Sequence, residues 1–336
     1  MNAVEKPEPT GASLRDKRIL VTGGTGLLGR AVVRELFEQG YREIYVPRGA
    51  SVNGSGAEDV TRLFNETRPH IVLHLALAPE EAGWRGHAAE CFASYVLRNT
   101  RMLDTACRRG VERMLCVASS AVYPAGAPAP LREKDIFNGL PEPAAAIAGT
   151  VERLALVQAQ ACREEFGFPC VYLIASNIYG PNDNFDPETA PLVPRLIRKF
   201  VEAAETGARE VTLAGTGCAT RDFLHADDCA QAIRLALERY DGADAVNLAS
   251  GIEVGIHELA RRIARLAGYS GQILWDASKQ DGPPRRVFDP TRAAKEFGFR
   301  ARKALQDGLY ETVEWYRSMR ARSEPEPRRM AAASRA

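Results

Sequence analysis

Three glycines spaced three residues apart, Gly23, Gly26 and Gly29, are the residues whose pattern most directly indicates a chemistry. An apolar run at 19–21 precedes them, and apolar residues at helical spacing follow them. Glycine permits a sharp turn and the close approach of a pyrophosphate, which then lies on the free N–H groups of the helix start. A simple strand-to-helix turn would not need this spacing. The pattern therefore predicts a dinucleotide-binding loop, formed by Gly23, Thr25, Gly26, Leu27, Leu28 and Gly29.

The next two predicted strands supply further cofactor contacts. The strand at 43–46 is followed by Arg48, at a position where an acid would bind the adenosine ribose and where arginine suits a 2′-phosphate. We therefore expect NADP(H) rather than NAD, although a surface arginine on a loop is the alternative. The apolar strand at 71–76 ends at Leu75 and Ala76, which we also assign to the cofactor site. His74, within that strand, is expected to be a hydrogen-bonded core histidine and not a ligand.

Composition limits the possible classes of protein. A length of 336 residues predicts two lobes, and a net charge of +1 gives no electrostatic reason to expect nucleic acid or a membrane surface as partner. The sequence has no apolar run of about 20 residues and no apolar signal segment near its start. The seven cysteines are scattered without a CxxC pair, which favours reduced thiols in a cytoplasmic protein and no metal site.

The order of predicted elements indicates the fold class. Strands at 19–21, 43–46, 71–76, 114–118 and 170–176 are separated by helices that include 90–109 and 144–165. This alternation predicts an α/β protein with a doubly wound parallel (Rossmann) sheet, whose ligands bind at the carboxyl ends of the strands. Ser119 lies at such an end.

Beyond residue 181 the pattern is less regular and predicts a smaller, interleaved α/β substrate lobe. We expect helices at 191–204, 226–239, 255–268 and 305–319, short strands at 211–213 and 246–248, and a loop at 215–225. The predicted division is a tail at 1–14, a Rossmann domain at 15–180 plus 221–250, a substrate lobe at 181–220 plus 251–320, and a tail at 321–336.

Several longer motifs carry a resemblance to a known family. They are VTGGTGLLG at 21–29, VASSAVYP at 117–124, SNIYGPNDNFDP at 176–187, GTGCATRDFLHADD at 215–228 and WDASKQDGPPRRVFD at 275–289. The chain resembles the extended short-chain dehydrogenase/reductase (NAD-dependent epimerase/dehydratase) family from about residue 17 to residue 316. Within it, the chain looks most like the GDP-L-fucose synthases. The resemblance implies NADPH-dependent epimerisation and reduction of GDP-4-keto-6-deoxymannose.

The reacting groups of that family are replaced in this sequence. The family uses a tyrosine and a lysine at i and i+4 on the long helix, a serine beside them, and a cysteine and a histidine for epimerisation. Alignment by the flanking motifs retains Ser119 alone. The tyrosine, lysine, cysteine and histidine positions hold, in order, Ala148, Glu152, Ala121 and Pro191. Residues 144–163 contain no tyrosine and no lysine, so a shifted alignment recovers neither.

The resemblance leaves most of the binding positions in place. It implies that Arg48 contacts the 2′-phosphate and that Asn177 and Asn184 line the sugar-nucleotide cleft. It also implies that the diphosphate is neutralised by Lys199, Arg221 and Arg286. Lysine at position 199 keeps the charge of the family's usual arginine but loses its bidentate geometry. For each base the alternative is a solvated surface residue.

Three hypotheses follow. The first is a redox-silent homologue that binds NADP(H), a nucleotide sugar or both, and acts as a non-catalytic subunit or regulator. By resemblance it would dimerise through the helices at 90–109 and 144–165, with itself or with an active homologue. The second is an enzyme with rewired chemistry that uses Glu152 as a base, with Ser119, Tyr123 or Tyr95 as hydrogen-bond donors. The third is a structural protein with an empty cleft.

Overall fold

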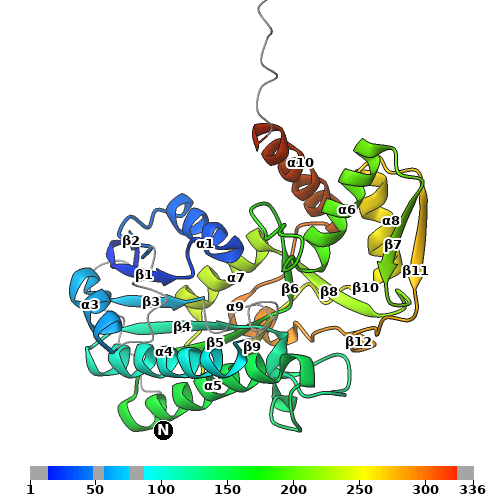
Figure 1. Cartoon of the computed structure of the whole chain (residues 1–336). Coiled ribbons are helices and arrows are strands. Elements are labelled where there is room, and N and C mark those ends of the chain that lie inside the picture. Colours follow the sequence, from blue (N-terminus) through cyan, green and yellow to red (C-terminus); the bar gives the residue numbers. More distant parts are fainter. Residues whose placement is uncertain (1–13, 48–56, 76–86, 324–336) are drawn as a thin grey trace, which may run out of the picture.

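The computed structural model describes residues 14–47, 57–75 and 87–323. At its centre lies a six-stranded sheet in the order β2-β1-β3-β4-β5-β9, with every neighbouring pair parallel (Figure 1). Its strands are β1 (Ile19–Thr22), β2 (Ile44–Tyr45), β3 (Ile71–His74), β4 (Arg113–Ala118), β5 (Cys170–Ala175) and β9 (Val246–Leu248). The predicted parallel sheet is confirmed. The strand order reverses between β1 and β3, which is where such sheets bind ligands.

Helices cover both faces of this sheet (Figure 1). One face carries α1 (Leu27–Glu38), α7 (Ala226–Arg239) and α9 (Thr291–Phe297). The other carries α3 (Ala57–Thr67), α4 (Ala88–Arg108) and α5 (Ala146–Phe166). Within β1, Ile19 and Val21 pack toward α1 while Leu20 packs toward α4. Because both faces are covered, the strands read as continuous apolar runs. Short 3₁₀ turns complete this part: η1 (Leu14–Asp16), η3 (Ser120–Val122), η4 (Glu133–Asp135) and η5 (Pro143–Ala145).

The smaller lobe has a core of its own, lined by α6 (Leu192–Thr206), α8 (Ile256–Leu266) and α10 (Leu305–Ser323). Strand β7 (Glu210–Ala214) pairs in parallel with β11 (Gln272–Asp276). A four-stranded sheet is formed by β6 (Asn177–Tyr179), β8 (Thr220–His225), β10 (Glu253–Gly255) and β12 (Arg285–Arg286). The lobe boundaries stay a prediction. None of the helices in the described ranges is long and apolar enough to cross a membrane.

Strand β8 corrects the prediction of a loop at 215–225, which is wrong from Thr220 onward. This segment pairs with β10, β12 and β6. Its side chains contribute to two hydrophobic cores, because Leu224 packs in the Rossmann core and Phe223 packs in the core of the smaller lobe. The strand therefore joins the two parts of the molecule.

A buried carboxylate fixes the loops beside β8. Asp222 is fully buried and accepts hydrogen bonds from Ser250 N at 3.1 Å, Ser250 Oγ at 2.7 Å and Gly251 N at 2.9 Å. Ser176 Oγ donates to the same carboxylate at 3.4 Å. These bonds tie the exits of β5 and β9 to β8, and so position the carboxyl edge of the central sheet.

Candidate functional site

The glycine turn connects β1 to α1 as predicted. Gly23 has φ +72°, and Gly26 N donates to Gly23 O at 3.1 Å. A Cβ on Gly29 would lie 2.1 Å from Gly23 O and 2.4 Å from Gly24 Cα, so only glycine fits there. Gly26 caps α1 without a side-chain hydrogen bond, which leaves the first N–H groups of the helix available to a ligand. This cradle fits a dinucleotide diphosphate.

A cavity of about 310 Å³ extends from this turn along the carboxyl edge of the sheet. Most of the predicted cofactor and catalytic residues line it, namely Gly23, Gly26, Leu27, Leu28, Gly29, Leu75, Ser119 and Glu152. Thr25 lies in the turn without lining the cavity, and its carbonyl accepts from Arg30 Nε at 2.8 Å. Arg48 and Ala76 lie outside the described residues. Sequence reasoning missed Asp183, which lines the cavity from the loop after β6.

Ser119 and Glu152 both line the cavity and form a closed pair, meaning that both carboxylate oxygens of Glu152 accept hydrogen bonds from Ser119. Ser119 N donates to Glu152 Oε1 at 3.0 Å and Ser119 Oγ donates to Oε2 at 3.1 Å. Only 3% of Glu152 is exposed, and this burial raises its pKa to about 7 against the lowering effect of the Ser119 hydrogen bonds. The Glu152 carboxyl therefore keeps its proton to a higher pH than a solvated glutamate does. The serine proton is directed to Glu152 instead of to the cavity.

Tyr123 is not available as a donor, so this part of the rewired hypothesis is wrong. Its side chain is fully buried, and its hydroxyl donates to Asn247 Oδ1 at 2.6 Å. The ring packs edge-on against Phe288, and burial raises the pKa of the hydroxyl. The chain turns through η3 just before Tyr123, and its ring joins the core on the α4–α5 side of the sheet.

The aligned tyrosine and cysteine positions are packed by residues of α4. Ala148 and Ala121 are buried in a small cluster against which Tyr95 packs. The Arg98 guanidinium lies 4.0 Å from the centre of the Tyr95 ring. The space beside α5 is thus filled by side chains of the neighbouring helix.

Two of the predicted phosphate-binding residues lie side by side. Arg221 on β8 is in register with Arg286 on β12, and Arg286 also donates to the carbonyl of Ser120, next to Ser119. Burial lowers the pKa of Arg221, and the charge of Arg286 lowers it further. Adjacent guanidinium groups of this kind favour an anion between or beside them.

None of the predicted substrate residues, Arg221 and Arg286 included, lines the cavity. The other three are engaged locally. Asn177 Nδ2 donates to Asp222 O at 2.8 Å, and Asn184 Nδ2 donates to Thr189 Oγ1 at 2.9 Å. Lys199 Nζ donates to Thr212 O at 3.1 Å. The structure therefore does not bring these residues together with Ser119 and Glu152.

His74 is confirmed as a hydrogen-bonded core histidine. Its Nδ1 lies 2.6 Å from Thr22 Oγ1 and its Nε2 lies 3.0 Å from Asn99 Oδ1. Burial lowers its pKa to about 4, so the ring is neutral at physiological pH.

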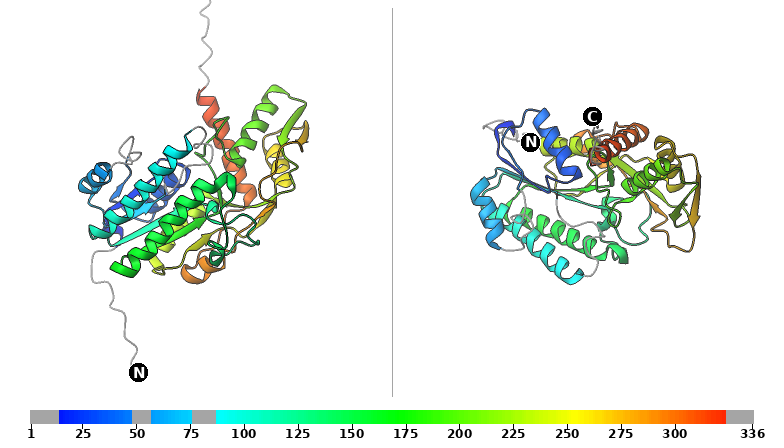
Figure 2. Two further views of the ribbon diagram at one scale, coloured as in Figure 1. Left: turned by 60° about the horizontal axis from the view of Figure 1, so that its bottom comes forward. Right: turned by 45° about the horizontal axis from the view of Figure 1, so that its top comes forward.

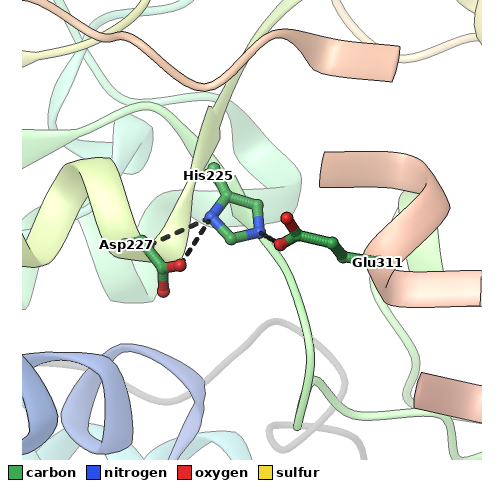
Figure 3. Close-up of side chains that lie close together, drawn as sticks. All are labelled: His225, Asp227 and Glu311. Carbon is green, nitrogen blue, oxygen red and sulfur yellow. Dashed lines mark hydrogen bonds and ion pairs between the residues drawn. The ribbon is translucent and has the colours of Figure 1, made fainter. Parts of the chain in front are cut away.

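A second polar cluster, shown in Figure 3, contains His225, Asp227 and Glu311, whose nearest donor atoms lie within 4.8 Å of one another. His225 Nδ1 accepts from Asp227 N at 3.2 Å, and its Nε2 lies 3.8 Å from Glu311 Oε2. Lys303 Nζ already lies 2.7 Å from the Glu311 carboxylate and 3.8 Å from that of Asp227. The lysine supplies the positive charge that a cation would bring. We therefore interpret the cluster as a group of ion pairs that connects α7 to α10 and has a structural role.

Comparison with known proteins agrees with this architecture. Residues 19–249 match the model of the NAD dependent epimerase/dehydratase family. A probable GDP-L-fucose synthase 1 of Oryza sativa is 35% identical over 94% of this chain and 97% of its own length. The GDP-L-fucose synthase of Escherichia coli is 28% identical over 89% of this chain and 96% of its own length. A GDP-L-fucose synthetase of Naegleria fowleri solved with NADP bound has a TM-score of 0.81 at 24% identity, covering 91% of this chain and 95% of that one. The chain belongs to the NAD dependent epimerase/dehydratase family.

Proposed function

We propose that this protein binds NADP(H), a nucleotide sugar or both, without the epimerisation and reduction of a GDP-L-fucose synthase. It would act as a redox-silent homologue or a non-catalytic subunit. The observation that carries the proposal is the composition of α5 where it meets Ser119. This helix holds no tyrosine and no lysine, and it presents the Glu152 carboxyl in a closed pair with the serine. A carboxyl group is neutral or negatively charged, so Glu152 cannot supply the positive charge of the family's lysine.

Retention of binding is supported by features that an empty cleft would not need. The glycine turn leaves the N–H groups at the start of α1 available, and Gly29 admits no Cβ. Arg221 and Arg286 are in register on adjacent strands, and Arg286 donates to the carbonyl of Ser120, so two positive charges lie close together where a diphosphate could bind outside the cavity lining. Bound NADP would supply hydride chemistry in an active relative. Here the chain's own residues would bind the phosphates and leave that hydride unused.

The first test is a direct assay. Incubation with NADPH and GDP-4-keto-6-deoxymannose is expected to oxidise NADPH at least about 10²–10⁴ times more slowly than a complete GDP-L-fucose synthase, because the positioned proton donor is lost. NADPH absorbance measures the rate, and the Escherichia coli relative is the positive control. Ordinary turnover would overturn the proposal. Loss of that turnover in Tyr95→Phe would then identify Tyr95 as the proton donor.

A second candidate function is proton transfer without redox change, such as an elimination or isomerisation. It is favoured by the Glu152 carboxyl, which lines the cavity and has a pKa of about 7, near the optimum for a general base. The same incubation in D₂O separates the two functions. Deuterium in the sugar without NADPH oxidation, lost in Glu152→Gln, would support this candidate; an unlabelled sugar would exclude it for this substrate.

We also propose that the protein dimerises through α4 and α5, with a second copy or an active homologue. The two helices run side by side along one face of the molecule (Figure 2). Val151 and Ala155 are buried, whereas Leu97, Leu154 and Val157 are 45%, 47% and 50% exposed. Part of the apolar face of α5 thus covers the sheet, and the remainder is open to a partner.

Leu154→Glu is expected to convert a dimer of the purified chain into a monomer, because a charge at the centre of an apolar interface is left unpaired. Light scattering after gel filtration measures the mass. Leu140→Glu is the control, since Leu140 is 84% exposed and lies in the loop before α5. A dimer that survives Leu154→Glu would place the interface elsewhere.

A further inference from the structure

The charge of the cavity changes from one end to the other. At the glycine end, the N–H groups of α1 suit negatively charged phosphates. Beside β4, the lining includes Glu152, which accepts hydrogen bonds from Ser119 directly after that strand. Among the described residues, no lysine, arginine or histidine lines this cavity. Whatever lies beside β4 therefore faces the Glu152 carboxyl.

The topology determines which part of a dinucleotide reaches the cavity beside β4. Strand β2 lies on one side of β1, while β3 and β4 lie on the other, and Ser119 follows β4. With its diphosphate on the glycine turn, the dinucleotide extends its adenosine half toward β2 and its nicotinamide half toward β4 and β5. Continuity of the cavity from Gly26 to Glu152 leads the nicotinamide toward the Glu152 carboxyl.

We propose that Glu152 makes this site selective for the oxidised, positively charged nicotinamide of NADP⁺ over the neutral ring of NADPH. The inference rests on the proposed function, namely that the protein binds NADP(H). The two nucleotides carry the same phosphates and sugars and differ in ring charge by the loss of one hydride. A carboxylate beside the ring would therefore bind NADP⁺ more tightly than NADPH by Coulomb attraction alone. No reaction is required.

Among the described residues, no lysine or arginine forms an ion pair with the Glu152 carboxyl. Ser119 N and Oγ face the carboxyl from the end of β4, and Asp183 lines the same cavity from the loop after β6. From β5, the Tyr172 hydroxyl donates to the Glu152 carbonyl at 2.6 Å. The neighbouring Arg153 turns away, and its Nε donates to Val122 O at 2.7 Å. Burial dominates the raised pKa of Glu152, and a pyridinium ring beside the carboxyl would lower it again.

The test is calorimetric titration of the full chain with NADP⁺ and with NADPH at pH 6.5 and pH 8.5. Ionisation of the 2′-phosphate cancels in the ratio of the two dissociation constants, because both nucleotides carry it. The preference for NADP⁺ is expected to be on the order of tenfold at pH 8.5 and smaller at pH 6.5. Titrations at pH 7 in buffers of different ionisation enthalpy are expected to show more proton release with NADP⁺ than with NADPH, because the 2′-phosphate contributes equally to both and the Glu152 carboxyl releases its proton to NADP⁺ binding alone.

Glu152→Gln is expected to remove both the preference and the additional proton release with NADP⁺, while the variant still binds both nucleotides through their phosphates. Glu164→Gln is the matched control, because Glu164 lies on the exposed face of the same helix. Equal affinities in the wild-type protein, or a preference that persists in Glu152→Gln, would overturn this inference but not the proposed binding of NADP(H). Failure of both nucleotides to bind would overturn NADP(H) binding itself, and this inference with it.

Discussion

Gly29→Ala is expected to abolish NADP(H) binding and to lower the free energy of unfolding by about 2–4 kcal/mol. The added Cβ would lie 2.1 Å from Gly23 O and 2.4 Å from Gly24 Cα. Both are backbone atoms of the turn, so they cannot rotate aside as a flexible side chain could. Relief of the clash must move α1 away from β1, and that movement opens the phosphate cradle.

Gly26→Ala provides the comparison within the same turn. Its Cβ would lie 3.6 Å from Gly23 O, and the residue has φ −77°, which alanine adopts readily. Stability is expected to change by less than about 1 kcal/mol, whereas binding should weaken because the methyl group lies where a phosphate approaches. Urea unfolding and fluorescence titration with NADPH measure the two effects. Undiminished binding in Gly29→Ala would contradict the assignment of the turn.

Glu152→Gln is expected to stabilise the protein at alkaline pH. The pKa of Glu152 rises from 4.5 to about 7 on folding, because burial disfavours its charged form. Between these values the folded state keeps a proton that the unfolded state has released. Stability therefore falls as the pH rises from about 4.5 to about 7, by about 3 kcal/mol in all, and stays lower above this range. Glutamine has no such proton to lose and keeps an amide oxygen for Ser119 N.

Chemical denaturation at pH 5 and pH 8 measures this prediction. The variant should match the wild type at pH 5 and exceed it by up to about 3 kcal/mol at pH 8. Glu164→Gln, on the exposed face of α5, should leave the pH dependence unchanged. Parallel curves for wild type and Glu152→Gln would show that the carboxyl is already ionised in the folded state. A carboxyl that costs stability at neutral pH is typical of a functional position.

The parts of the fold that depend on local pattern could be predicted from the sequence. The apolar runs of β1, β3 and β5 and the glycine turn carry their signals within a few neighbouring residues. Strand β8 could not be recognised in this way, since its partners β10 and β12 follow it at a distance along the chain. Only the folded pairing shows that Thr220–His225 is extended.

The candidate site likewise contains features that the sequence could predict and features that depend on residues far apart in the chain. Alignment placed Glu152 beside Ser119, although the residues are 33 positions apart, but it could not show that the two hydrogen bonds close the pair. The direction of Tyr123 depends on Asn247 and Phe288, which lie far along the chain, and so its burial was missed. The position of Asp183 at the cavity could have been predicted, because an acidic residue in the loop after a strand near the carboxyl edge can reach the cavity.

Strand β8 also limits how the molecule can be divided. Leu224 belongs to the packing of one lobe and its neighbour Phe223 to that of the other. A cut on either side of this strand would expose apolar surface in both halves. Neither half is therefore expected to persist as a folded fragment, and opening of the cavity must come from segments other than this shared strand.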